Sequence, residues 1–150
     1  MDAIKFNNIE EVESILKNST KNKKLLKLNE KDEEGRNPLY RAISYKNIEI
    51  VKLLIEYANQ HQIILELNEK NIYGDYPLLY AIFNNNIEIV KLLIDYANQH
   101  QIPLEYDKNT IFDIFQKNIF VRYLGFKPQI QKLLENYEKE KEWKKVNIYK

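Results

Sequence analysis

Two histidines at matching positions are the first residues that suggest chemistry. His61 and His100 each end the same segment, Tyr-Ala-Asn-Gln-His. Imidazole is a common metal ligand, but a metal site needs further ligands, and neither an acid nor a third histidine is fixed beside this pair. Equivalent points on neighbouring packed helices also lie about 10 Å apart, too far for shared ligation. We therefore expect two matched surface or helix-end residues, with no metal and no cofactor.

Few other residues of the chain could act in catalysis. The chain has no cysteine, and adjacent acids such as Glu10 with Glu11 and Glu33 with Glu34 fit solvated turns or helix faces. Its three glycines fit turns, so no glycine-rich loop remains to hold a phosphate. Because no base, nucleophile and stabilising group can be assembled, we expect no catalytic residues and no enzymatic activity.

An internal repeat organises the chain. Residues 28–66 and 67–105 align without a gap and match at 27 of 39 positions. A segment copied at fixed period is typical of stacked-repeat proteins, in which each unit buries its apolar face against the next. The differences are clustered, because 10 of the 12 lie within residues 32–46 and their partners 71–85. We expect surfaces that hold the stack to repeat and outward surfaces to vary.

The pattern within each unit predicts a turn followed by two helices. Gly35 and Gly74 lie in short polar segments that suit a turn with positive φ. A proline three residues later suits the first turn of a helix, and Asn37 is a good N-cap whereas Tyr76 is a poor one. Asparagine-containing steps then interrupt each helix, since asparagine tolerates the left-handed conformation. The expected first helices cover residues 38–45 and 77–84.

A longer second helix is expected from Ile48 and again from Ile87. Apolar residues recur there at helical spacing and should form the buried stripe. In the first copy this stripe consists of Val51, Leu54, Ile55 and Ala58. Tyrosines also recur in register, and we assign them to packing between units: Tyr57, Tyr96 and Tyr137.

Both ends of the chain keep fragments of the pattern. Residues 1–27 lack the glycine turn and the proline, and polar residues replace part of the apolar stripe. Near the other end, Gly125 followed by Pro128 predicts the end of one helix and the start of another. Residues 135–145 mix acids and bases at helical spacing. We expect them to form an exposed helix that closes the stack and frays over residues 146–150.

The two copies resemble an ankyrin repeat. Segments that begin Gly35-Arg-Asn-Pro-Leu and Gly74-Asp-Tyr-Pro-Leu, each followed by Val-Lys-Leu-Leu, are similar to the family pattern Gly-x-Thr-Pro-Leu-His and Val-x-x-Leu-Leu. Each unit is about six residues longer than the family's period of about 33. Where the family has threonine and histidine, the two copies have Asn37 with Tyr40, and Tyr76 with Leu79.

This resemblance implies an all-α fold, a single ankyrin-type solenoid over residues 1–150. Helix pairs would form its body, and short hairpin fingers would project between them. The units would be a truncated N-terminal repeat or cap at 1–27, full repeats at 28–66 and 67–105, and a degenerate C-terminal repeat with capping helices at 106–150. The extra residues would lengthen either the second helix or the connection to the next unit.

The clustered differences predict a protein-binding face on the finger tips and the concave helix surface. Aromatic residues and arginine are the usual anchors of protein interfaces. The first copy would contribute Asp32, Glu33, Glu34, Arg36, Tyr40, Arg41 and Tyr45. The second copy would contribute Asn71, Tyr73, Asp75, Tyr76 and Tyr80. Phe83 could either bind a partner or fill space beneath the capping segment. An alternative hypothesis is a structural segment of a larger repeat array, with any partner docking on the C-terminal helices.

Charge and hydropathy narrow the kind of partner. The net charge of +1 gives no steering toward nucleic acid or acidic lipid, and the basic cluster around Lys24 lies close to acids in the sequence. No stretch approaches the roughly 18 apolar residues of a membrane span, and residues 1–11 lack the basic and then apolar run of a secretion signal. We therefore expect another protein as partner, no nucleic acid or membrane, an intracellular (cytoplasmic or nuclear) location and, from two capped ends, a monomer.

Overall fold

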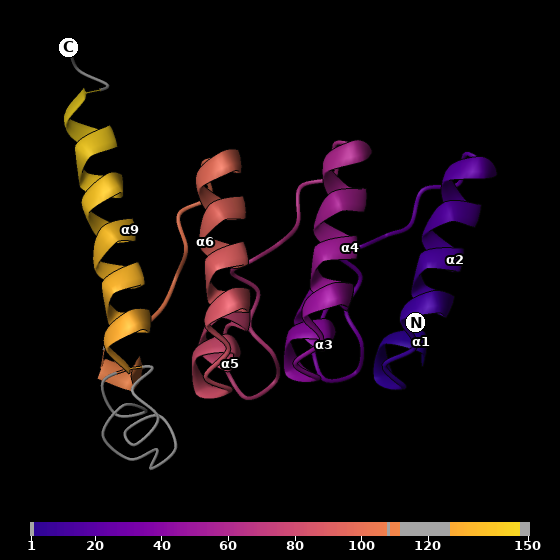
Figure 1. The fold of residues 1–150 in the computed structure, drawn as a ribbon, viewed down its shortest axis with the longest axis horizontal. Coiled ribbons are helices and arrows are strands. Elements are labelled where there is room, and N and C mark those ends of the chain that lie inside the picture. Colours follow the sequence, from indigo (N-terminus) through magenta and orange to yellow (C-terminus); the bar gives the residue numbers. More distant parts are fainter. Residues whose placement is uncertain (1, 108, 112–126, 148–150) are drawn as a thin grey trace.

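The computed structural model describes residues 2–107, 109–111 and 127–147. Their helices are α1 (Asp2–Lys5), α2 (Ile9–Lys21), α3 (Pro38–Ser44), α4 (Ile48–Gln60), α5 (Pro77–Phe83), α6 (Ile87–His100) and α9 (Lys127–Asn147). This described part contains no strand. Figure 1 shows the long helices α2, α4, α6 and α9 side by side in a row, with the short helices α1, α3 and α5 spread along its lower edge, each beside the lower end of the long helix that follows it. The predicted all-α stack of helix pairs is confirmed.

The first helix of each repeat begins as predicted. In α3 the Asn37 side chain accepts a hydrogen bond of 2.8 Å from the Tyr40 N–H, whereas Tyr76 provides no side-chain cap for α5. Both helices end one residue earlier than expected, at Ser44 and Phe83. The difference between the two N-caps therefore follows directly from the side chains, because only asparagine has an acceptor that reaches the third N–H.

The step between the two helices of a repeat uses two adjacent residues for different purposes. Lys46 (φ 58°) and Asn85 (φ 55°) adopt the left-handed conformation. The following residues, Asn47 and Asn86, cap α4 and α6 by accepting a backbone N–H on their side chains. The expectation that asparagine would supply the left-handed residue holds for the second copy only, because Lys46 takes that place in the first.

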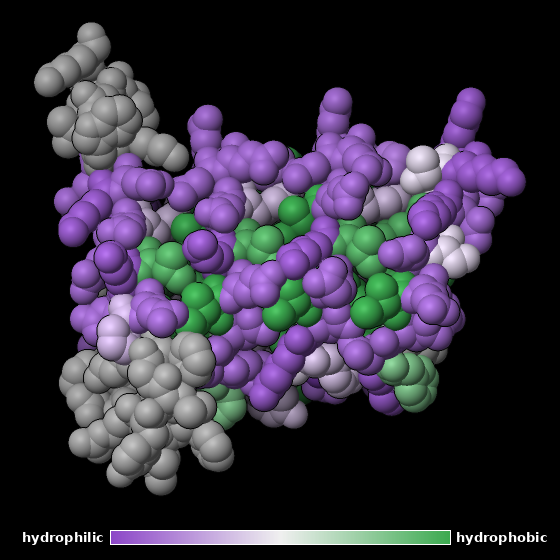
Figure 2. All heavy atoms as spheres, viewed as in Figure 1, coloured by the Kyte–Doolittle hydropathy of each residue, from purple (hydrophilic) through white to green (hydrophobic). Residues whose placement is uncertain are grey.

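The second helices carry the core. Val51, Leu54 and Ala58 are fully buried, as expected, while Ile55 is only partly buried. The extra length of each unit is shared, because α4 includes Asn59 and Gln60 and the rest lies in the linker that follows. Figure 2 shows hydrophobic side chains between the long helices, bordered by hydrophilic ones. Stacking therefore leaves the edge of the core visible along the row.

Three tyrosines each hold one linker to the next long helix along the chain, and we call them the tyrosine ladder: Tyr57 on α4, Tyr96 on α6 and Tyr137 on α9. Each hydroxyl accepts a hydrogen bond from a linker N–H. These donors are Leu26 for Tyr57 (3.2 Å), Leu65 for Tyr96 (3.0 Å) and Leu104 for Tyr137 (2.7 Å). Since the three rings are also buried, the prediction that these tyrosines pack between units is confirmed.

The C-terminal helix α9 packs against α6 and covers the last full repeat. Its buried side chains are Ile130, Leu134 and Tyr137, and most of its other described side chains are exposed. The expected closing helix is therefore present, and its start at Lys127 agrees with the helix start predicted from Pro128. Residues 146 and 147, which were expected to fray, still belong to α9. Gly125 and residues 148–150, with the helix end and the fraying predicted there, lie outside the described residues.

Candidate functional site

Two short turns form the fingers of this stack. The first finger is residues 32–36 and the second finger is residues 71–75. In each, a side-chain oxygen accepts two backbone N–H groups, Asp32 from Glu34 and Arg36 (3.0 and 2.9 Å), and Asn71 from Tyr73 and Asp75 (both 2.9 Å). Aspartate and asparagine both offer this oxygen, so the change between copies preserves the turn.

The two fingers are also fixed to one another. The Ile72 N–H donates to the Glu34 carbonyl oxygen at 3.0 Å. Gly35 has φ +74°, and a Cβ added there would lie 3.3 Å from the Asn71 Cα, closer than ordinary contact. The glycine is therefore required both for its backbone conformation and for the close approach of the second finger.

The charged side chains of the first finger form ion pairs with one another. Arg36 donates from Nε and Nη2 to Asp32 Oδ2 (3.1 and 3.0 Å) and from Nη2 to Glu34 Oε1 (2.9 Å). Partial burial alone would raise the pKa of Asp32, but hydrogen bonds from the Arg36 backbone and side chain and from the Glu34 N–H outweigh it and hold that pKa below its usual value. These groups therefore stabilise the finger as well as lining its surface.

Large apolar side chains are exposed at the finger tips and at the ends of the short helices. Tyr73 is 71% exposed and Ile72 is 62% exposed, both on the second finger. Tyr45 and Phe83, at the ends of α3 and α5, are exposed as well. Ile72 was absent from the predicted face, although its replacement of Glu33 is one of the clustered differences and could have identified it.

Two predicted contact residues are not available to a partner. Tyr40 is only 1% exposed, because its ring packs 5.4 Å from the Tyr80 ring and its hydroxyl donates to the Asp75 carbonyl oxygen at 3.2 Å. Burial also raises the pKa of Tyr40. Asn71 is buried as well, since its side chain closes the second finger. The expectation that these two residues face outward is therefore wrong, because their side chains make their contacts inside the stack. Both positions differ between the copies because of those internal contacts.

The remaining candidates lie at the surface to different degrees. Glu33 is exposed, and the partly buried ones are Asp32, Glu34, Arg36, Arg41, Asp75, Tyr76 and Tyr80. Tyr76 donates from its hydroxyl to Glu105 Oε2 (3.0 Å), and the Lys70 ammonium lies 4.7 Å from its ring centroid. The ring is therefore held in place by a hydrogen bond and a cation–π contact.

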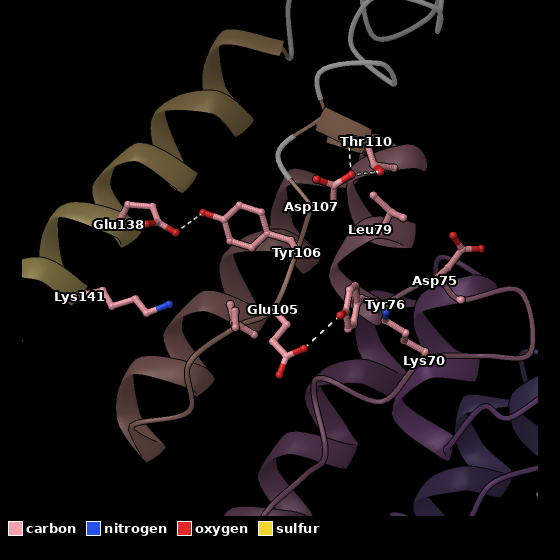
Figure 3. A pocket seen from close by; sticks show the side chains of 12 residues that line it. Lys70, Asp75, Tyr76, Leu79, Glu105, Tyr106, Asp107, Thr110, Glu138 and Lys141 are labelled. Carbon is pink, nitrogen blue, oxygen red and sulfur yellow. Dashed lines mark hydrogen bonds between the residues drawn. The ribbon is translucent and has the colours of Figure 1, made fainter.

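A cavity of about 630 Å³ lies beside Tyr76, between the second finger, the linker at residues 104–107 and α9. Figure 3 shows Tyr106 and Glu138 pointing toward one another across it; the Tyr106 hydroxyl donates to Glu138 Oε1 at 2.5 Å. Burial, with this carboxylate beside it, raises the pKa of Tyr106. Acidic and basic side chains both line the cavity, and its tyrosines bond to acids, so its described groups largely satisfy one another.

The histidines are helix-end residues, as predicted. His61 Nε2 lies 2.9 Å from Thr20 Oγ1, and His100 Nε2 lies 2.9 Å from Asn59 Oδ1. Each ring also packs on the ladder tyrosine of its own helix. No group of three or more potential metal ligands occurs within the described part of the chain. Both imidazoles thus join one unit to the preceding one.

The fold and surface define a stacked helical-repeat protein with preformed fingers. A family model of ankyrin repeats, in three copies, matches residues 1–109. The chain belongs to the ankyrin-repeat family, whose members are generally protein–protein interaction modules and typically lack enzymatic activity. Comparison with curated proteins yields no match. None of the helices that the structure describes has the length and apolar character needed to cross a bilayer.

Proposed function

We propose that this chain is a non-catalytic module that binds a partner protein on its fingers and concave helix surface. One observation carries the proposal. Within the described residues, seven large hydrophobic side chains are exposed, and four of them lie in the two segments that differ between copies: Tyr45, Ile72, Tyr73 and Phe83. Stacking does not require apolar groups at these places, whereas interfaces favour them.

The rigidity of the fingers supports the same proposal. Each finger is closed by side-chain and backbone hydrogen bonds, and the Ile72 N–H bonds the first finger to the second. Side chains on a preformed surface lose little conformational freedom when a partner binds, so more of the contact energy appears as affinity. The proposed contact set accordingly gains Ile72 and loses the buried Tyr40 and Asn71.

Affinity capture followed by surface substitutions tests this proposal. Partners recovered with the tagged chain from its own cells would be identified by mass spectrometry, and their affinity measured with Ile72→Ser and Tyr73→Ala. We expect a loss of about 30-fold or more if these residues anchor the interface. Ile64→Ser is the matched control, because Ile64 is an exposed isoleucine in a linker outside this face. Unchanged affinity for the first two variants would contradict the proposed face.

A further inference from the structure

A second cavity of about 630 Å³ opens on the N-terminal side of the first full repeat. The end of α2, the linker that follows it, the first finger and the start of α3 surround this cavity, which we call the basic cavity. Five basic and two acidic side chains line it. Leu25, which is 49% exposed, and Pro38 add apolar surface.

Two of the five cationic side chains, those of Lys24 and Arg41, form no hydrogen bond with any residue that the structure describes. Lys27, Lys31 and Arg36 each pair with a carboxylate. By contrast, the Lys24 ammonium makes no ion pair or hydrogen bond with any residue that the structure describes. The Arg41 Nε lies 3.7 Å from Asp32 Oδ2, too far for a hydrogen bond, and has no other acceptor among the described residues.

The surroundings of Arg41 make this lack of acceptors costly. Its side chain is only 13% exposed and its Nε atom is buried, so water does not replace the hydrogen bond that the Nε–H can donate. A buried donor without a partner destabilises the free protein. The terminal guanidinium nitrogens are not among the buried unpaired atoms, so an incoming carboxylate would accept both of their N–H groups at once. Lys24 would add a second positive charge at the same opening.

We propose that the basic cavity binds a short linear segment of a partner protein, in which an acidic side chain lies beside an apolar one. The carboxylate contacts Arg41 and Lys24, and the apolar side chain contacts Leu25 and Pro38. This proposal rests on the function proposed above and names the chemistry of the partner at one end of the same surface, because Arg36 and Arg41 belong to both.

A peptide fits the basic cavity better than a nucleic acid does. Three of its five cations already pair with carboxylates, which leaves enough positive charge for one acidic side chain but not for the row of closely spaced phosphates of a nucleic-acid strand. Its volume lies within the range of about 300–1,000 Å³ that encloses a small number of side chains. None of the described residues that line it is aromatic, so it offers no ring on which a base could stack.

Peptide selection gives the direct test. A random peptide library displayed on phage would be selected on the immobilised full chain, and a fluorescein-labelled selected peptide titrated by fluorescence anisotropy. We expect selected sequences enriched in Asp or Glu next to Leu, Ile or Phe. Arg41→Gln should weaken binding about 30-fold or more, and Lys24→Gln should weaken it about threefold to tenfold. Lys23→Gln, which removes a neighbouring exposed charge outside the cavity, should leave affinity unchanged.

Each other outcome overturns the proposal. Failure to select any binder, selected peptides without acidic residues, or binding that survives Arg41→Gln combined with Lys24→Gln would exclude an acidic ligand. Tighter binding of a labelled single-stranded oligonucleotide, with a steep loss in salt, would assign the basic cavity to nucleic acid instead. If Tyr73→Ala weakened a captured partner while Arg41→Gln did not, the cavity would be excluded and the proposed function would stand. Circular dichroism would verify that each variant is folded.

Discussion

Replacing Tyr96 with phenylalanine removes a single hydroxyl from the boundary between two repeats. That hydroxyl accepts a hydrogen bond from the Leu65 N–H (3.0 Å) and donates one to the Ile63 carbonyl oxygen (3.2 Å). The ring stays, so its packing is preserved. Leu65 is buried, so water has little access to the N–H left behind. Tyr96→Phe therefore isolates what the hydroxyl contributes to holding a linker.

The expected cost follows from the groups that lose a partner. A buried donor left unsatisfied costs about 1–3 kcal/mol. The Ile63 carbonyl belongs to a partly buried residue and regains some hydration, so it adds little. We expect a loss of about 2 kcal/mol, which lowers the Tm of a protein of this length by about 4–8 °C.

Urea unfolding followed by circular dichroism measures this change. Tyr73→Phe is the matched control, because Tyr73 is largely exposed and its hydroxyl bonds to none of the described residues. Its effect should stay within about 0.5 kcal/mol. If Tyr96→Phe destabilised the protein no more than Tyr73→Phe, the tyrosine ladder would not be holding the linkers, and the account of the stack would be refuted.

Alkaline pH provides a second measurement on the same variant. Burial raises the pKa of Tyr96 above its usual value of 10.0, although the bond from Leu65 opposes part of that increase. A raised folded-state pKa contributes stability that is fully present below the unfolded-state pKa and is lost as the pH rises above it. The stability difference between the wild type and Tyr96→Phe should therefore narrow above pH 10, since phenylalanine does not titrate.

Three further predictions concern the fingers and the C-terminal helix. Gly35→Ala should cost about 1–2 kcal/mol more than Gly74→Ala in thermal unfolding, because both residues have positive φ but only Gly35 meets the other finger; equal costs would show that the fingers separate freely. Asp32→Asn should lower stability by about 1 kcal/mol at neutral pH. Because the folded-state pKa of Asp32 is depressed below 3.8, this difference should vanish as the pH falls through it, and a difference independent of pH would contradict the ion pair. Deleting residues 138–150 should destabilise the folded chain by more than about 1 kcal/mol, because Glu138 accepts a hydrogen bond from Tyr106 and Glu140 accepts one from Asn98 of the preceding unit. The deletion should not weaken a partner on the fingers; lost binding at unchanged stability would support docking on the C-terminal helix instead.

Local chemistry explains which parts of the fold could be predicted. Caps, turns and buried stripes depend on residues near one another in sequence, so Asn37, Gly35 and the recurring tyrosines indicated them correctly. The exposure of Tyr40 could not be predicted in this way. Its ring rests on Tyr80 and its hydroxyl on the Asp75 carbonyl oxygen, and both contacts come from the next repeat.

The candidate site shows the same limit. Variation between two copies has two causes, exposure to a partner and adjustment to an unequal neighbour, and one sequence does not separate them. Tyr73 is exposed, as a residue of the first kind would be, whereas Tyr40 belongs to the second kind by its contacts. The sequence could not predict that Arg41 Nε lacks a hydrogen bond either. Its distance of 3.7 Å to Asp32 Oδ2 exceeds the length of a hydrogen bond by less than about 1 Å.

The tyrosine ladder has a direction, because each of the three linkers that it binds is held by a helix that comes later in the chain. The N–H of Leu65 donates to the hydroxyl of Tyr96, 31 residues later in the chain, and that of Leu104 donates to the hydroxyl of Tyr137, 33 residues later. During synthesis, the linker that follows a repeat therefore cannot form this hydrogen bond until most of the following repeat has left the ribosome. Translation pauses within a repeat would leave the preceding boundary open, whereas pauses after it would let the growing protein close one joint at a time.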